Sequence, residues 1–254
     1  MGYLDSIILG IVEGLTEFLP ISSTGHLILA STALGLSHSE FLKTFQIAIQ
    51  LGAIGAVLFQ FPRSFIDIEI LKRIAIAFVP TMIIGYLAYD AVRSVLFGNE
   101  LVVVIALIAG GIVMILFDQW RRPPAEGVVG DITYTHAFLV GIFQSFAIVP
   151  GVSRSGATVI GGLSLGIPRT AIVEFSFLLA VPTMLAATAL DILKTPAALS
   201  RDEVTLLLTG FVTAFLVALL SVRWFLGFIR TSSFTVFGIY RIALGLVFFF
   251  TFLY

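Results

Sequence analysis

Long apolar stretches alternate with short clusters of charged residues along this chain. A helix needs roughly 20 apolar residues to cross a bilayer core of about 30 Å. Six stretches reach about this length: 41–61, 74–92, 101–117, 171–190, 204–222 and 234–254. Charged segments such as FPRSFIDIEILKR and FDQWRRPPAEGVVGD separate them. The pattern predicts a protein that crosses a membrane several times.

Two further apolar segments, about 5–36 and 136–167, are interrupted halfway by LPISSTG and VPGVSRSG. Proline, glycine and consecutive hydroxyl residues cannot continue a helix that faces lipid, because the freed backbone groups would have no partner there. We therefore predict that each segment is a helix–loop–helix hairpin that enters the membrane and returns on the same side. Irregular backbone at this depth is tolerated only where protein or a water-filled cavity surrounds it.

The two broken segments are related to each other. A shift of 131 residues places GIVEGLTEFLPISSTGH over GIFQSFAIVPGVSRSGA. The coinciding pairs include Gly10 with Gly141, Glu13 with Gln144, and Ser22 with Ser153. One hairpin and three transmembrane helices per half would leave the second half upside down. We predict an all-α polytopic membrane protein with one integral membrane domain, 1–254, built as an inverted repeat of about 1–127 and 128–254.

The tetrapeptide VPTM does not follow this repeat. It occurs at 79–82 and again at 181–184, and the offset between the two copies differs from that of the hairpins. The predicted spans that contain the two copies are not equivalent in the repeat, so the repeat does not explain the motif.

Composition agrees with a membrane protein and excludes several kinds of site. Hydrophobic residues make up 59% of the chain and charged residues 11%, whereas soluble domains contain about a quarter charged residues. The chain has no cysteine, which excludes disulfides, thiolate metal sites and a cysteine nucleophile. The net charge of −1 and the lack of a basic run give no indication of a nucleic-acid partner, and we expect none.

Two acidic residues lie just ahead of the interruption in the first broken segment. Glu13 and Glu17 are four residues apart, so they share one face of a helix. Two carboxylates this close either share a proton or hold a cation. A single glutamate could instead cap a helix or extend to the membrane surface. Acidic residues inside a membrane are costly and usually functional, so we interpret the pair as catalytic and metal-binding.

The two loops have similar sequences, SSTG at 22–25 and SRSG at 153–156, and each precedes an apolar helix. Backbone amides at a helix N-terminus, with hydroxyl groups beside them, bind anions. Simple N-capping is the alternative for either loop alone. Two such loops brought together by the repeat favour an anion site. The predicted substrate-binding residues are Ser22, Thr24, Gly25, Ser153, Ser155 and Gly156.

Arg154 takes the place of Ser23 in the second loop, so this loop alone supplies a guanidinium group. A buried arginine is costly unless it is paired, and its planar fork matches phosphate oxygens. The alternative is that Arg154 only neutralises Glu17. His26 is interpreted as a proton donor or phosphate ligand, and a core histidine is the alternative. Ser23 is the candidate nucleophile.

Glu174 and Arg241 are further charged residues inside predicted spans. Both would lie near the same face of the membrane in this topology. We therefore interpret them as a structural ion pair that takes no part in the chemistry.

The candidate residues together suit phosphoryl transfer, which needs charge neutralisation, positioning and proton handling. A diphosphate monoester brings about three negative charges, and the two glutamates add more than Arg154 and His26 can balance. We therefore expect a divalent cation, Mg²⁺ or alternatively Ca²⁺, held by Glu13, Glu17 and the diphosphate. A pocket inside the bilayer also implies a substrate with a hydrophobic tail.

EGLTEFLPISSTGH and PGVSRSG, at this separation in so hydrophobic a chain, resemble the undecaprenyl-diphosphate phosphatase family of the bacitracin-resistance type. The resemblance covers the whole chain. It implies hydrolysis of undecaprenyl diphosphate to undecaprenyl phosphate and phosphate with a divalent metal, which recycles the lipid carrier for bacterial cell-wall synthesis. The residues to which the resemblance gives catalytic roles are Glu13, Glu17, Ser23, His26 and Arg154. Whether Ser23 attacks phosphorus or positions a water stays open here.

A different class of function shares the predicted architecture. Inverted repeats with broken helices are typical of secondary transporters, and a fold alone does not determine function. A transporter or flippase for an anionic solute or a polyprenyl phosphate lipid is therefore the alternative. The partners we expect are a polyprenyl diphosphate lipid as substrate and the surrounding membrane lipid, and a homodimer is compatible with the sequence.

Lysine and arginine residues are unevenly divided between the two sides of the predicted topology. One side has eight: Arg63, Lys72, Arg73, Arg121, Arg122, Arg169, Arg223 and Arg230. The side of the two termini has four: Lys43, Arg93, Lys194 and Arg201. Since cytoplasmic loops carry the excess of positive residues, we expect the termini outside the cytoplasm. The site would then open to the extracytoplasmic side of the bacterial inner (plasma) membrane.

Overall fold

A computed structural model describes residues 1–37, 39–91, 100–120, 126–194 and 199–252. These residues form helices and connections, with no strand among them. The α-helices are α1 (Tyr3–Thr16), α2 (Ser23–Ala33), α3 (Glu40–Gln60), α4 (Ile68–Ala91), α5 (Glu100–Trp120), α6 (Tyr134–Ser145), α7 (Arg154–Ser164), α8 (Arg169–Lys194), α9 (Arg201–Thr231) and α10 (Thr235–Phe252). Two short 3₁₀ helices, η2 (Val129–Asp131) and η3 (Phe146–Ile148), flank α6.

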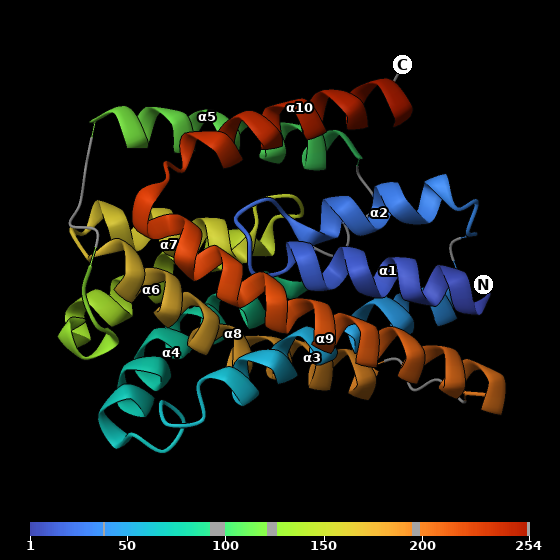
Figure 1. Cartoon of the computed structure of the whole chain (residues 1–254), viewed down its shortest axis with the longest axis horizontal. Helices are drawn as coiled ribbons and strands as arrows, with labels where there is room; N and C mark the ends of the chain where they lie inside the picture. The colour runs from blue at the N-terminus through green and yellow to red at the C-terminus, as the bar shows by residue number, and fades with distance from the viewer. Residues whose placement is uncertain (38, 92–99, 121–125, 195–198, 253–254) are drawn as a thin grey trace.

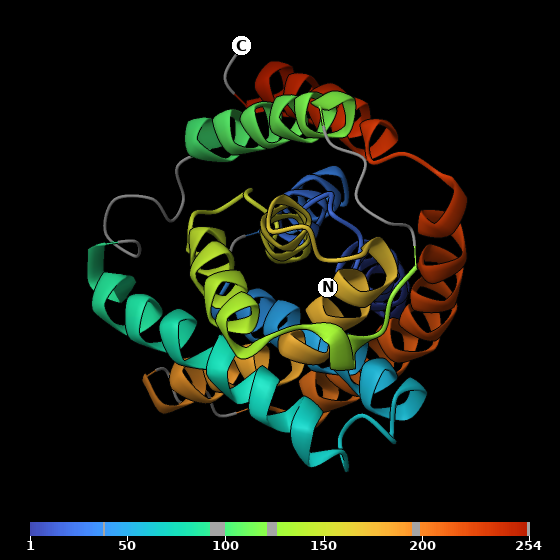
Figure 2. The same ribbon diagram turned by 90° about the vertical axis from the view of Figure 1, so that its left-hand side faces the viewer.

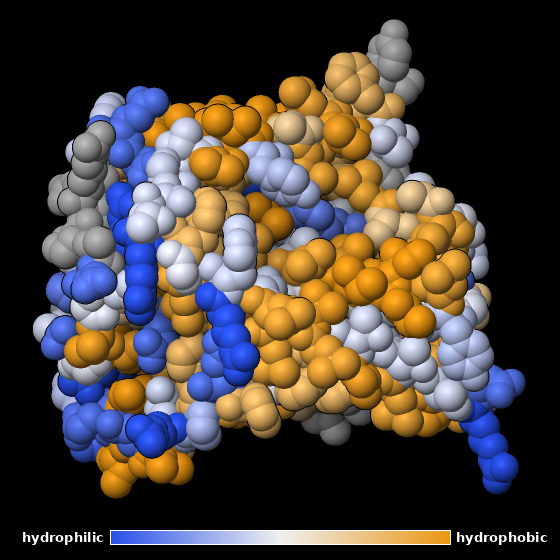
Figure 3. All heavy atoms as spheres, viewed as in Figure 1, coloured by the Kyte–Doolittle hydropathy of each residue, from blue (hydrophilic) through white to orange (hydrophobic). Residues whose placement is uncertain are grey.

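Five of these helices are long and apolar enough to cross a membrane, counted over the described ranges: α3, α4, α5, α8 and α9. They coincide with five of the six predicted spans. The sixth, 234–254, is helical as α10, and its described part is shorter than the other five. In the view of Figure 3, polar residues gather at the two ends of the molecule and hydrophobic residues cover much of the surface between them. The prediction of an all-α, multi-pass membrane protein is confirmed.

Both broken segments are helix–loop–helix hairpins, as predicted. The first consists of α1 and α2, and the second of α6, η3 and α7. In Figure 1 the first hairpin lies at the end of the molecule that carries the N-terminus, and α6 and α7 lie toward the opposite end. Figure 2 shows α7 (yellow) near the centre of the view, with α5 and α10 above it and α9 at the right-hand edge. The long helices therefore surround the loops at which the hairpins turn.

The first helix of each hairpin packs closely on one long helix. α1 contacts α9, and α6 contacts α4. A Cβ atom on Gly10 would lie 2.7 Å from the carbonyl oxygen of Gly210, and one on Gly141 would lie 2.0 Å from that of Ala77. Only glycine allows the backbones to approach this closely. The two glycines coincide in the sequence repeat, but the inverted orientation of the two halves stays a prediction.

Aromatic packing fixes the turn that follows α1. Phe18 is fully buried and meets Phe177 of α8 edge to face, with 5.2 Å between the ring centroids. Phe177 in turn lies 6.1 Å from Phe225 of α9. Because Phe18 directly follows Glu17 in the chain, this cluster anchors the backbone that carries the carboxylate.

The termini lie on the same side of the molecule, as the predicted topology requires. In Figure 1 the N-terminus and the end of α10 are both on the right, whereas the connection between α3 and α4 is at the opposite end. Of the positive residues counted on the two sides, Arg93, Arg121 and Arg122 lie outside the described residues, as does the side chain of Lys194.

Candidate active site

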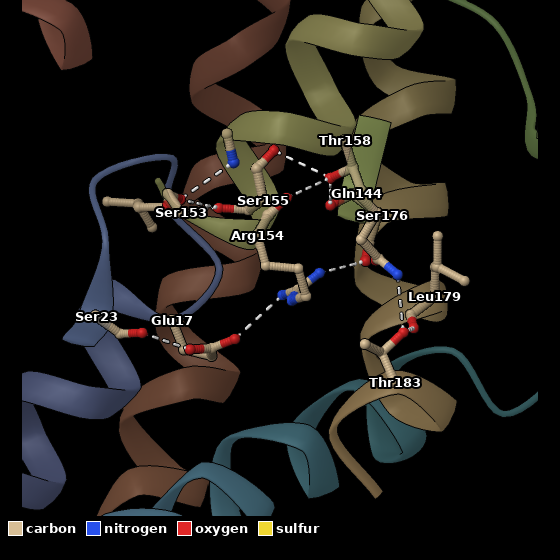
Figure 4. A network of polar contacts seen from close by, with 12 residues as sticks. Glu17, Ser23, Gln144, Ser153, Arg154, Ser155, Thr158, Ser176, Leu179 and Thr183 are labelled. Atoms are coloured by element: carbon tan, nitrogen blue, oxygen red, sulfur yellow. Dashed lines mark hydrogen bonds and ion pairs between the residues drawn. The ribbon is translucent and has the colours of Figure 1, made fainter. Parts of the chain in front are cut away.

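The loops of the two hairpins meet at Glu17. Ser23 Oγ donates a hydrogen bond to Glu17 Oε2 at 2.7 Å, and Arg154 Nη2 of the second hairpin donates to Glu17 Oε1 at 3.2 Å. Figure 4 shows the carboxylate between these two side chains. The side chains of Arg154 and Glu17 are 11% and 5% exposed, so little water screens the pair. One carboxylate thus joins a hydroxyl and a guanidinium from sequence positions far apart.

Further bonds hold the two loops and α8 in place around this contact. Arg154 Nη1 donates to the carbonyl oxygen of Ser176 in α8 at 2.8 Å. Ser155 Oγ of the second hairpin donates to the carbonyl oxygen of Leu19 in the first at 2.7 Å. The orientation of Arg154 is therefore fixed from two sides.

The two loops adopt the same local conformation where the second helix of each hairpin begins. Ser22 and Ser153 have positive φ angles of 71° and 67°, a region that costs a non-glycine residue about 1–3 kcal/mol. Each serine also caps its helix, because its Oγ accepts a hydrogen bond from the backbone N–H of Gly25 or Gly156. The N-capping that the sequence offered as an alternative is therefore present at both loops.

A cavity of about 290 Å³ opens beside the Glu17–Arg154 contact. From the two hairpins it is lined by Glu17, Ser22, Ser23, Thr24, Ala147, Ile148, Val149, Pro150, Gly151, Ser153, Arg154 and Gln144. The long helices contribute Gln50, Thr81, Thr183, Met184 and Ala187. A hydroxyl, a carboxylate and a guanidinium therefore face one space inside the membrane protein.

Glu13 lies beside this site without a hydrogen-bond donor of its own. It is fully buried, and neither of its carboxylate oxygens has a partner among the described residues. Its carboxylate lies within hydrogen-bonding reach of the Glu17 carboxylate and also interacts electrostatically with Arg154. A buried carboxylate in such surroundings has to be neutralised by a proton or a cation. Carboxylate oxygens are ligands that Mg²⁺ and Ca²⁺ prefer, so the residues present fit such a cation.

The protein alone would not complete the coordination of a metal ion. No group of three or more His, Cys, Asp or Glu residues suited to a metal occurs in the part of the chain that the structure describes. Glu13 and Glu17 would supply the protein ligands, and phosphate oxygens and water the others, which is common for Mg²⁺.

Comparison with known proteins decides the family. Residues 6–247 match the family described as bacitracin resistance protein BacA. The chain belongs to this family. It is 50% identical to the undecaprenyl-diphosphatase of Aquifex aeolicus over 246 residues, which cover 96% of each chain. It is 48% identical to that of a Sulfurihydrogenibium species over 251 residues, 98% of this chain and 99% of that one. The undecaprenyl-diphosphatase of Flavobacterium psychrophilum is 44% identical over 251 residues, 97% and 95% of the two chains.

Not all predicted site residues of this BacA-family protein reach the cavity. Those that line it are Glu17, Ser22, Ser23, Thr24, Ser153 and Arg154. Those outside its lining are Glu13, Gly25, His26, Ser155 and Gly156. Gly25 and Gly156 take part in the caps, and Ser155 joins the loops. The functional roles assigned to all these residues stay predictions.

His26 illustrates the difference between a residue near the site and a residue in it. Its Nδ1 bonds to the carbonyl oxygen of Ser22 at 2.8 Å, and its Nε2 bonds to the hydroxyl of Tyr240 in α10 at 2.7 Å. The two rings are stacked with centroids 5.5 Å apart. Both ring nitrogens are therefore engaged, and the side chain connects the first loop to α10.

Several polar residues that line the cavity were missed as site residues. Thr81, Gln144 and Thr183 belong to three different helices and all face it. Signals were present in the sequence: the threonines belong to the two VPTM segments, and Gln144 coincides with Glu13 in the repeat. Neither signal by itself indicated a site.

The predicted ion pair between Glu174 and Arg241 is wrong. Arg241 is fully buried, and its guanidinium donates to backbone carbonyl oxygens instead. Nε bonds to Leu107, Nη1 to Pro20 and Val152, and Nη2 to Ala106 and Gly151, at 2.9–3.4 Å. Because a guanidinium has five N–H groups, none is left for Glu174. Arg241 thus connects α5 and both hairpin loops.

We predict that Arg241→Lys lowers the free energy of unfolding by at least about 2 kcal/mol, since an ammonium group has only three donors and leaves buried carbonyl oxygens unpaired. The thermal unfolding midpoint of the purified protein in detergent measures this. Arg230→Lys, at an exposed position of α9, is the matched control and should leave the midpoint unchanged. Equal midpoints for the Arg241 and Arg230 variants would contradict the role given to Arg241.

Proposed function

We propose that this protein is an undecaprenyl-diphosphatase: it hydrolyses undecaprenyl diphosphate to undecaprenyl phosphate and inorganic phosphate. This reaction would recycle the lipid carrier for bacterial cell-wall synthesis and give bacitracin resistance. The names of its relatives, which align along nearly the whole chain, support the proposal. The observation that carries it is the Glu17 carboxylate, which accepts hydrogen bonds from a cavity-lining hydroxyl and from a guanidinium.

The geometry suits Ser23 as the nucleophile. Its hydroxyl hydrogen already points to Glu17, so the proton has an acceptor when Oγ attacks. A bond then forms between Ser23 Oγ and the terminal phosphorus, and the bond from that phosphorus to the bridging oxygen breaks. Undecaprenyl phosphate leaves, and water subsequently cleaves the phosphoserine to release inorganic phosphate and restore the hydroxyl.

Arg154 balances the charge that this reaction brings into a buried site. Of its three guanidinium nitrogens, two are bonded to Glu17 and Ser176, and Nε has no partner among the described residues. A guanidinium held in this way can also contact phosphate oxygens that line up along its edge. It would stabilise the negative charge on the phosphoryl oxygens in the transition state.

We propose Glu13 and Glu17 as the protein ligands of a divalent cation, Mg²⁺ or alternatively Ca²⁺. Both oxygens of Glu17 already accept hydrogen bonds, whereas those of Glu13 have no partner in the described part of the chain. Glu13 is therefore the more available ligand. When bound, the cation would neutralise phosphate charge that Arg154 alone does not balance.

Phosphate release from undecaprenyl diphosphate by the purified protein in detergent, without any gradient, tests the function. We expect release that a chelator abolishes and Mg²⁺ restores. Glu17→Gln should slow it by about a hundredfold or more, because an amide is a poor base and a poor metal ligand. The variant should still fold, since glutamine keeps the shape of the side chain.

Glu40→Gln, which removes an exposed carboxylate 65% accessible to solvent, is the control and should release phosphate at the wild-type rate. A wild-type protein that moved the lipid across vesicle membranes but released no phosphate would overturn the proposal in favour of a transporter. Wild-type turnover by Glu17→Gln would remove this residue from the mechanism.

We also propose that the protein resides in the bacterial inner (plasma) membrane and that the site opens to the extracytoplasmic side. The eight positive residues opposite the termini, against four beside them, support this orientation. The first hairpin, with Glu17 and Ser23, begins at the side of the N-terminus. It would therefore face the compartment in which wall synthesis releases lipid diphosphate.

Single cysteines test the orientation, because the chain has no native cysteine. Ser37, which the predicted topology puts on the side of the termini, is exposed. For the other side of the predicted topology, Ala125 lies outside the described residues, so the neighbouring exposed Glu126 is the better partner. We expect a membrane-impermeant thiol reagent to label Ser37→Cys but not Glu126→Cys in spheroplasts, and to label both after permeabilisation. The reverse pattern in intact spheroplasts would invert the topology.

A further inference from the structure

The two VPTM segments converge on one side chain in the cavity wall. Gln144 Nε2 of α6 donates hydrogen bonds to Thr81 Oγ1 in α4 and to Thr183 Oγ1 in α8, each at 3.0 Å. The bond to Thr183 is drawn in Figure 4. Thr81 and Thr183 are the third residues of the two tetrapeptides. The motif that the repeat leaves unexplained thus builds a common polar contact from three helices.

The threonine hydroxyls fix which way the amide points. Thr81 Oγ1 donates to the carbonyl oxygen of Gly141 at 2.9 Å, and Thr183 Oγ1 donates to that of Leu179 at 2.8 Å. With its hydrogen used in this way, each hydroxyl oxygen can only accept from Gln144. Both N–H groups of the amide are then satisfied by threonine oxygens. The nitrogen therefore faces the threonines, and the side-chain oxygen faces away from them.

That oxygen has no hydrogen-bond partner among the described residues, although Gln144 is only 1% exposed. Leaving a buried acceptor unpaired is costly. Gln144, Thr81 and Thr183 all line the cavity that also contains Ser23 and Arg154. Because Gln144 itself lines the cavity, a molecule held there can supply the donor that its side-chain oxygen lacks.

We propose that Gln144 is a further binding residue of the site, whose side-chain oxygen accepts a hydrogen bond from an O–H group held in the cavity. A bare phosphate oxygen is itself an acceptor and does not suit it. The group that fits is the hydrogen-bearing oxygen of a phosphate, or an ordered water beside the bound phosphate. Thr81 and Thr183 are positioning residues that fix the amide. The inference rests on the proposed function for one point, that the ligand in the cavity is a phosphate group.

A glutamine at position 144 agrees with a role in binding phosphate. Gln144 coincides with Glu13 in the sequence repeat, so the second half carries an amide where the first carries a carboxylate. A carboxylate at position 144 would be a third buried one in or beside the cavity, after Glu13 and Glu17, and would repel a phosphate. An amide oxygen keeps the acceptor and avoids the charge.

Binding of inorganic phosphate and of sulfate to the purified protein, measured by calorimetry, tests the proposal without depending on turnover. Phosphate carries a hydrogen at neutral pH and sulfate does not. Gln144→Met keeps the length of the side chain but removes the acceptor. If the oxygen binds a P–O–H group, this variant should bind phosphate about five- to tenfold more weakly and sulfate as before. If it binds an ordered water, both anions should weaken alike.

Two sets of variants separate binding from general destabilisation. Gln60 of α3 also has a buried side-chain oxygen without a partner in the described residues, but it does not line the cavity. Gln60→Met should leave both affinities unchanged. Thr81→Val and Thr183→Val keep Gln144 but release one N–H each, so the amide can rotate. Each should weaken phosphate binding about two- to fivefold, which keeps the test valid if Gln144→Met does not fold.

If Gln144→Met binds both anions as tightly as the wild type, the proposal is wrong. If Gln144→Met does not fold, unchanged affinities in both Thr81→Val and Thr183→Val would overturn it instead. Failure of the proposed hydrolysis is a separate result. It would appear as anion binding by the wild type without any phosphate release from the lipid diphosphate.

Discussion

The rest of the site depends on the hydrogen bonds that Arg241 donates to five backbone carbonyl oxygens. They give the buried loops the hydrogen-bond partners that their backbone needs. Two irregular loops lie deep within a membrane protein, where water cannot pair with backbone groups. One buried guanidinium supplies donors to Pro20 of the first loop, to Gly151 and Val152 of the second, and to α5. Its hydrogen bonds hold the loops together without a counter-ion.

With the loops fixed, the charges of the candidate site can come together. Ser155 bonds across to the first loop, and Phe18 anchors the turn next to Glu17. Arg154 then reaches a carboxylate from the other hairpin in surroundings with little solvent. An isolated charge would be unstable there, but the pair neutralises itself and leaves a hydroxyl, a carboxylate and a guanidinium beside the cavity. Glu13 has no hydrogen-bond donor among the described residues, so its buried carboxylate needs a proton or a cation to neutralise it.

Much of this could be read from the sequence, because membrane structure imposes strong rules. Apolar length predicted the spans, and proline, glycine and hydroxyl residues predicted both hairpins. The high cost of charge in a membrane singled out Glu17 and Arg154, which the structure brings into contact. The described part of α10, however, is shorter than the other spans.

The rest depends on contacts whose partners the sequence does not specify. The acceptors of Arg241 are backbone carbonyl oxygens, which every residue has, so an acidic partner was wrongly expected in Glu174. His26 engages Tyr240, more than 200 positions later in the chain. Gln144 meets Thr81 and Thr183 only because three helices cross at one depth. Such contacts follow from the packing of helices, which hydrophobic patterning alone does not determine.

A double-mutant cycle between the hairpins tests the central claim, that Glu17 and Arg154 form one site. Phosphate release from undecaprenyl diphosphate would be measured for the wild type, Glu17→Gln, Arg154→Lys and the double variant. Residues that act as a unit are strongly non-additive, so the account predicts that the double variant is about as slow as the slower single variant. Rate losses that multiply in the double variant would show that the two residues act independently and would contradict the account.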